Sequence, residues 1–87
     1  MISYLYQIKN PQGLHARPAS KLFMEAGKFS SAIVLKTTKG EADCRNLLEI
    51  MGLGAESGEM VEFSFSGEDE DRAKAAFQKL VEDDLNL

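Results

Sequence analysis

The stretch NPQGLHARPASKLFMEAG, Asn10–Gly27, marks a change in the hydrophobic pattern of the chain. Before it, apolar and polar residues alternate, which is typical of a strand with one solvated face; the apolar side carries Ile2, Tyr4, Tyr6 and Ile8. The residues Asn-Pro-Gln-Gly predict a turn after this strand. From Ala16 the apolar residues recur every three or four positions, at Ala16, Ala19, Leu22, Phe23 and Ala26. This spacing predicts an amphipathic helix, with Gly27 ending it in a left-handed conformation.

The remaining chain predicts three further strands and two further helices. AIVLKT, 32–37, is a strand that turns through Thr38–Gly40 into a brief strand at 41–43. Asn46, followed three residues later by Glu49, predicts a capped short helix over 47–51, which the glycines at 52, 54 and 58 end. Alternation marks a strand at 61–65. The last helix starts near Asp69 with the apolar stripe Ala73, Ala76, Phe77, Leu80 and Val81.

The predicted order of elements is therefore βαββαβα, an α+β fold. Each of the four strands has one apolar face, and each of the three helices has one apolar stripe. These apolar surfaces are buried against one another when all helices cover the same side of an antiparallel sheet. The pattern leaves the strand order open, because a ferredoxin-like arrangement has most of this succession.

Length and composition restrict the class of protein. Eighty-seven residues predict a single domain, 1–87. The net charge of −4 argues against general nucleic-acid binding. Cys44 is the only cysteine, so the chain can form no internal disulfide, and we expect no metal site. We expect the Cys44 side chain to be a small apolar group of the core. No signal peptide or apolar run of membrane length is present, which predicts a cytoplasmic protein without membrane insertion.

The only histidine, His15, falls where the first helix is predicted to begin. As the N-cap it would stand before Ala16, Arg17 and Pro18, where backbone N–H groups have no partner within the helix. These amides, the positive end of the helix dipole and the Arg17 guanidinium suit an anion. This arrangement is compatible with a histidine that accepts a phosphoryl group and passes it on.

Other interpretations of the same residues exist. His15 could serve only as a cap, with Arg17 in a surface ion pair. A metal site lacks a second histidine, and a hydrolytic triad lacks the G-x-S-x-G nucleophile turn. The glycines of GLGAESG lack the Lys-Ser/Thr of a nucleotide-binding loop, so we interpret them as turn residues.

PQGLHARPAS closely resembles the active-site signature of the HPr family, the histidine-containing phosphocarriers of the bacterial phosphotransferase system. Chain length, the Leu-rich helix after Asn46 and SGEDED before the last helix also fit. The resemblance implies an open-faced β-sandwich with sheet order 1-4-2-3. It implies that His15 takes a phosphoryl group on Nδ1 from enzyme I and passes it to IIA domains of sugar permeases. Arg17 and the amides of Ala16 and Arg17 would hold the phosphate. Such a protein is a co-substrate, not an enzyme, and needs no cofactor; we expect a monomer.

A carrier of this kind needs a surface that several partners can use. In NLLEIMGL we assign Ile50 and Leu53 to the core, which leaves an exposed group of Leu47, Leu48 and Met51. Burial of all five under loops is the alternative. On the first helix, the side that carries Arg17 also has Ser20, Lys21 and Met24. Local basic charge is expected from Arg17, Lys21, Lys28 and Arg45.

Two positions depart from the family pattern. Asn46 stands where the kinase-controlled branch has a serine, so that regulatory phosphorylation should be absent, although Asn46 still caps the helix. Glu49 stands where many members have a basic or neutral residue, which would alter docking. A rival interpretation is therefore a regulatory binding module of the same fold that docks partners without serving sugar transport.

Overall fold

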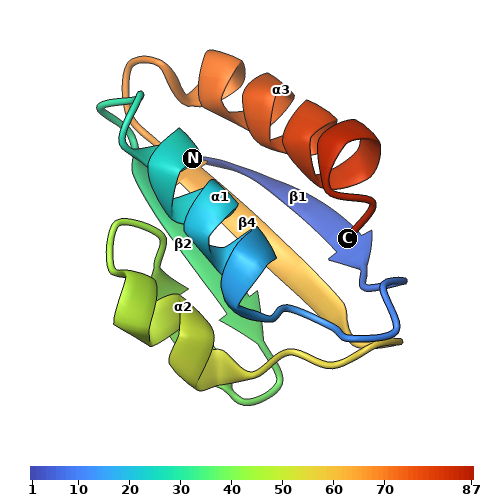
Figure 1. Cartoon of the computed structure of the whole chain (residues 1–87). Helices are drawn as coiled ribbons and strands as arrows, with labels where there is room; N and C mark the ends of the chain where they lie inside the picture. Colours follow the sequence, from blue (N-terminus) through green and yellow to red (C-terminus); the bar gives the residue numbers. More distant parts are fainter.

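Four strands form one antiparallel sheet in the order β1-β4-β2-β3, in a computed structural model that describes residues 1–87. The helices cover one face of this sheet (Figure 1). The elements are β1 (Ile2–Gln7), α1 (Ala16–Ala26), β2 (Ala32–Thr37), β3 (Gly40–Asp43), α2 (Leu47–Leu53), β4 (Met60–Ser66), α3 (Glu70–Lys79) and a short π-helical segment, η1 (Leu80–Asp84). The predicted α+β succession is confirmed, and the sheet order is the one that the family resemblance implies. None of the helices has the length and apolar character needed to cross a lipid bilayer.

The core lies between the sheet and the helices, centred on β4. Val61, Phe63 and Phe65 face the helices and are fully buried, as their alternation predicts. Phe77 of α3 meets the rings of Phe63 and Phe65 edge-on, with ring centroids 5.6 and 5.5 Å apart. Since edge-to-face contacts are favourable for aromatic rings, these three phenylalanines fix α3 across the middle of the sheet.

Helix α1 begins at Ala16 as predicted, but its buried stripe is narrower than the sequence pattern indicates. Ala16 and Phe23, both assigned to that stripe, are exposed, whereas Pro18 is buried. The end of the helix also differs. Gly27 has right-handed dihedral angles (φ −66°) and donates its N–H to the Phe23 carbonyl, so the predicted left-handed termination is wrong. The amide of Lys28 instead closes a tighter turn onto Glu25, and no residue with positive φ is needed.

Helix α2 is capped by Asn46, whose side-chain oxygen accepts the Glu49 N–H at 3.2 Å. The Glu49 carboxylate accepts the Asp43 N–H and the Asn46 side-chain amide, rather than closing back on the Asn46 backbone. The helix runs through Gly52 and ends at Gly54, which is left-handed (φ 60°). Asn46 therefore keeps the structural function expected of it, as a cap.

Cys44 is fully buried in the core, as expected for an apolar filler. Burial, and to a smaller extent the charge of Asp43, raises the pKa of its thiol to about 12. The reactive thiolate is therefore scarce at neutral pH. We predict that iodoacetamide at pH 8 leaves Cys44 unmodified in the native protein and modifies it in denaturant, as measured by intact mass. Modification at equal rates in both conditions would contradict this prediction.

Asp69 joins the start of α3 to the loop between α1 and β2. Its carboxylate accepts the N–H groups of Ser30 and Ser31, each at 2.9 Å, and the Ser31 hydroxyl. These hydrogen bonds, led by that of the Ser31 hydroxyl, lower the pKa of Asp69 from 3.8 to about 2. Because the folded-state pKa is depressed, this carboxylate stabilises the fold fully above the unfolded pKa, and the stabilisation is lost as the pH falls towards 2.

Replacing Asp69 with asparagine should therefore lower the stability at pH 7 and flatten its decline between pH 4 and 2. The asparagine side chain retains one acceptor oxygen, but its N–H₂ group faces a hydrogen-bond donor of Ser30 or Ser31. Urea unfolding across this pH range measures both effects. Asp71→Asn is the matched control, because Asp71 is exposed in the same first turn. Parallel pH profiles for wild type and Asp69→Asn would contradict the assignment.

Candidate functional site

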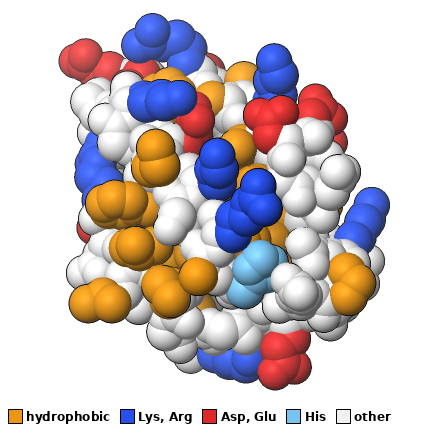
Figure 2. All heavy atoms as spheres, in the orientation of Figure 1, with side chains coloured by type: hydrophobic (Ala, Val, Ile, Leu, Met, Phe, Trp, Pro, Cys, Tyr) orange, Lys and Arg blue, Asp and Glu red, His pale blue; other side chains and the backbone are white.

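His15 stands immediately before α1 in extended conformation (φ −97°, ψ −171°), the N-cap position that the sequence predicts. Its side chain makes no capping hydrogen bond, and neither imidazole nitrogen bonds to any other group of the protein. The ring is half-buried. Figure 2 shows it at the surface, with Lys and Arg side chains on one side and hydrophobic side chains on the other. The imidazole is therefore free to react, and the interpretation of His15 as a cap alone does not describe its side chain.

Two backbone donors next to His15 are unused. The first helical hydrogen bond runs from the Ala19 N–H to the His15 carbonyl at 3.0 Å, and Pro18 has no N–H. The N–H groups of Ala16 and Arg17 donate to no acceptor in the protein. Together with the helix dipole, these two amides make the start of α1 suited to an anion beside the imidazole.

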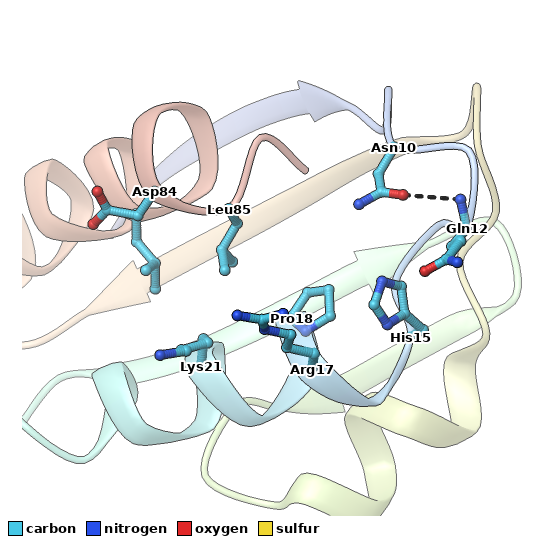
Figure 3. A pocket seen from close by; sticks show the side chains of 9 residues that line it. Asn10, Gln12, His15, Arg17, Pro18, Lys21, Asp84 and Leu85 are labelled. Atoms are coloured by element: carbon cyan, nitrogen blue, oxygen red, sulfur yellow. Dashed lines mark hydrogen bonds between the residues drawn. The ribbon is translucent and has the colours of Figure 1, made fainter.

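The imidazole lines a pocket of about 520 Å³ to which three separate parts of the chain contribute. The turn after β1 supplies two carboxamides, the start of α1 supplies the histidine and two cations, and the end of the chain supplies the opposite wall (Figure 3). The lining residues are Asn10, Gln12, His15, Arg17, Pro18, Lys21, Leu80, Asp84 and Leu85. Sequence reasoning assigned Asn10 and Gln12 only to a turn, and it missed the residues from the C-terminal segment because no local motif links them to His15.

Arg17 and Lys21 carry the positive charge of this pocket. Neither side chain forms an ion pair with a carboxylate, so the alternative of Arg17 in a surface ion pair is wrong. The other two predicted basic residues are engaged elsewhere: Lys28 pairs with Glu25 at 3.2 Å, and the Arg45 guanidinium donates to the Phe29 carbonyl. The four basic residues therefore do not form the single basic region that was expected. Only Arg17 and Lys21 lie beside the histidine, and both are free of ion pairs.

An apolar patch made of Phe23, Met24, Leu48 and Met51 lies on the neighbouring helices α1 and α2. Leu48 is 81% exposed, Met24 64% and Met51 44%, as the sequence predicts. Ile50 and Leu53 are buried, also as predicted. Leu47 was expected to be exposed, but it is half-buried because it packs against the core. Phe23 joins the patch instead, because it is 38% exposed and is not part of the core.

The other residues predicted for the docking surface differ in how exposed they are. Lys21 is exposed, whereas Ser20 is half-buried. Glu49 is exposed, but its carboxylate is already held by two N–H donors at the start of α2. Its negative charge is therefore held at the start of α2, the helix that also carries Leu48 and Met51 of the apolar patch.

An open-faced β-sandwich with a free imidazole beside anion-binding donors has the architecture of a histidine phosphocarrier. The family model described as "PTS HPr component phosphorylation site" matches residues 2–83. The chain therefore belongs to the HPr family of the phosphotransferase system, whose members are phosphocarriers and not enzymes.

Known relatives agree in sequence and in structure. Phosphocarrier protein HPr of Lysinibacillus sphaericus is 38% identical over 76 residues, which cover 87% of this chain and 86% of the relative. The crystal structure of HPr-C-His from Thermoanaerobacter tengcongensis is also 38% identical, with a TM-score of 0.87 over 94% of this chain and 92% of the other. The Bacillus subtilis catabolite repression protein Crh, described as a swapped dimer, is 27% identical, with a TM-score of 0.72 over 94% of each chain.

Proposed function

We propose that His15 accepts a phosphoryl group from phosphorylated enzyme I and passes it to IIA domains of sugar permeases. The observation that carries this proposal is the hydrogen-bond-free imidazole of His15 beside the unused amides of Ala16 and Arg17. A lone pair on the imidazole Nδ1 attacks phosphorus, and the bond between phosphorus and the donor atom of enzyme I breaks with its electrons returning to that atom. The reverse displacement, with a IIA domain as acceptor, regenerates the free imidazole.

The groups around His15 stabilise the phosphate in this scheme. The amides of Ala16 and Arg17 and the Arg17 guanidinium donate hydrogen bonds to its oxygens, while Lys21 adds a second positive charge at the pocket wall. None of these donors must first break a bond within the protein. They are therefore preorganised for the charge that arrives with the phosphoryl group.

The apolar patch defined above is proposed as the docking surface, extended by Ser20, Lys21 and the half-buried Leu47. Exposed methionines adapt to differently shaped partners, which suits a carrier that meets both a donor and several acceptors. The pocket is complete within one chain, which supports a monomer as the working form. We place the protein in the cytoplasm, where enzyme I and the IIA domains act.

The test is incubation with enzyme I and phosphoenolpyruvate labelled with ³²P. We expect one phosphoryl group per chain, acid-labile and alkali-stable, mapped to the peptide containing His15. Addition of IIA domains should then remove the label. Absence of label on the wild type would refute the proposal. Label that no IIA domain removes would favour the regulatory binding module instead.

Arg17→Ala should slow phosphorylation about 10- to 100-fold, because a charge-assisted hydrogen bond contributes roughly 1.5–3 kcal/mol. Arg17→Lys should recover part of this loss, since it restores the charge but not the two-pronged donor geometry. Initial rates of labelling by enzyme I measure the effect. Arg72→Ala, which removes an exposed arginine from α3, is the control and should label at the wild-type rate. Equal rates for Arg17→Ala and Arg72→Ala would remove Arg17 from the site.

A further inference from the structure

We infer that Leu87 is a positioning residue for His15: it fixes the turn that leads into the phosphoryl-accepting histidine. This inference rests on the proposed function. Leu87 is fully buried, and its main-chain oxygen accepts the N–H groups of Lys9 and Asn10, each at 2.7 Å. Its own N–H donates to the Val81 carbonyl at 3.0 Å. Figure 1 shows this end of the chain beside the end of β1, where the turn begins.

A continuous series of hydrogen bonds joins Asn10 to His15. The Asn10 carbonyl accepts the Gly13 N–H and its side-chain oxygen accepts the Gln12 N–H, both at 2.9 Å. The Gly13 carbonyl then accepts the His15 N–H at 3.1 Å. The Asn10–Gln12 hydrogen bond lies at the pocket edge next to the imidazole (Figure 3). A shift of Asn10 would therefore be transmitted to the backbone of His15.

The same turn is attached on its other side to the loop after α2. The Leu14 N–H donates to the Ala55 carbonyl at 2.9 Å, and Gly13 lies directly against that carbonyl. Loss of the Leu87 attachment thus leaves the turn held on one side only. We expect the turn to remain folded but less precisely placed, which distinguishes a positioning effect from global unfolding.

Leu87 itself lies outside the part of the chain that the family model matches, residues 2–83, whereas Lys9 and Asn10 lie within it. The segment 84–87 also supplies Asp84 and Leu85 to the wall of the His15 pocket. A second contact holds the approach to this segment, because the Tyr4 hydroxyl donates to the Glu82 carboxylate. The end of the chain therefore has two structural functions at this site: it forms one wall of the pocket, and it fixes the turn opposite.

The test compares Leu87→Ala with Leu35→Ala, which truncates an equally buried leucine in β2, and with the conservative Leu87→Met. Leu87→Ala keeps the main-chain oxygen but removes most of the buried side chain that holds it in place. Under conditions where all variants are folded, it should therefore lower kcat for phosphorylation by enzyme I about 10- to 100-fold, the cost of misplacing a reacting group by about an ångström. KM should not change, because the apolar patch is untouched. Leu87→Met should restore kcat, and Leu35→Ala should retain it.

The imidazole of His15 provides a second readout, since it is the only histidine and its NMR signals are unambiguous. These signals should move in Leu87→Ala and not in Leu35→Ala at the same pH. Unchanged kcat and signals in Leu87→Ala, or equal changes in both alanine variants, would overturn the inference. If Leu87→Ala does not fold, Leu87→Val and Leu35→Val make the same comparison. If the wild type is not phosphorylated, the proposed function fails, and the imidazole signals alone decide the inference.

Discussion

Replacing His15 with alanine is expected to abolish phosphoryl acceptance from enzyme I, leaving the rate at background. His15 is the only histidine, and no other nucleophile in the pocket stands beside the unused amides at the start of α1. The fold should be unaffected, because the imidazole forms no hydrogen bond within the protein. A substitution at such a position usually changes stability by no more than about 0.5 kcal/mol. Labelling from ³²P-phosphoenolpyruvate and urea unfolding measure the two effects separately.

A loss of label in His15→Ala is informative only if the donor works. Phosphorylated enzyme I should therefore be detected in the same reaction, and Lys36→Ala, a change on β2 away from the pocket, should label at the wild-type rate. Phosphate that remains on the His15→Ala protein would show that another residue is the acceptor. That result would remove the central assignment.

Gly13→Ala is expected to have the second largest effect, on both stability and transfer. Gly13 has φ +67°, and a Cβ there would lie 2.5 Å from the Ala55 carbonyl oxygen. A non-glycine residue in this conformation costs roughly 1–3 kcal/mol, and the collision with backbone adds to that. We expect a total loss of about 2–4 kcal/mol. The hydrogen bond from Leu14 to Ala55 must also lengthen, which displaces His15 and slows phosphorylation.

Gly52→Ala is the matched control for this prediction. Gly52 lies within α2, and a Cβ there meets no atom within 4 Å. Alanine is a better helix former, so the control should be stabilised by about 0.5–1 kcal/mol. Urea unfolding and the initial rate of labelling should separate the two variants. Equal stabilities for Gly13→Ala and Gly52→Ala would mean that the contact between the turn and Ala55 is looser than the structure indicates.

The sequence predicts those parts of the fold that depend on local spacing. Alternation places Phe63 and Phe65 on the buried face of β4, and the change of period places the start of α1 at Ala16. Which residues of a helical stripe are buried depends on the neighbouring elements. Phe23 fits the apolar spacing of α1 but stays 38% exposed outside the core, whereas Leu47 fits an exposed position but packs against the core.

The residues of the candidate site also fall into those that local sequence predicts and those that it does not. His15 and Arg17 are identifiable because both lie within one turn of a helix start, where unused amides are a general property. Asp84 and Leu85 are not, because they reach the pocket through the π-helical segment η1 and the final residues. Such contacts between distant segments have no local signature in the sequence.

The absence of any internal hydrogen bond to the His15 imidazole has a consequence for the direction of exchange. In the proposed function, loading breaks no hydrogen bond between groups of the protein and only adds those from Ala16 and Arg17 to the phosphate, so no contact within the protein has to be rearranged in either direction. Net flux would then follow the relative phosphorylation of donors and acceptors in the cell, and it would reverse when that ratio is inverted.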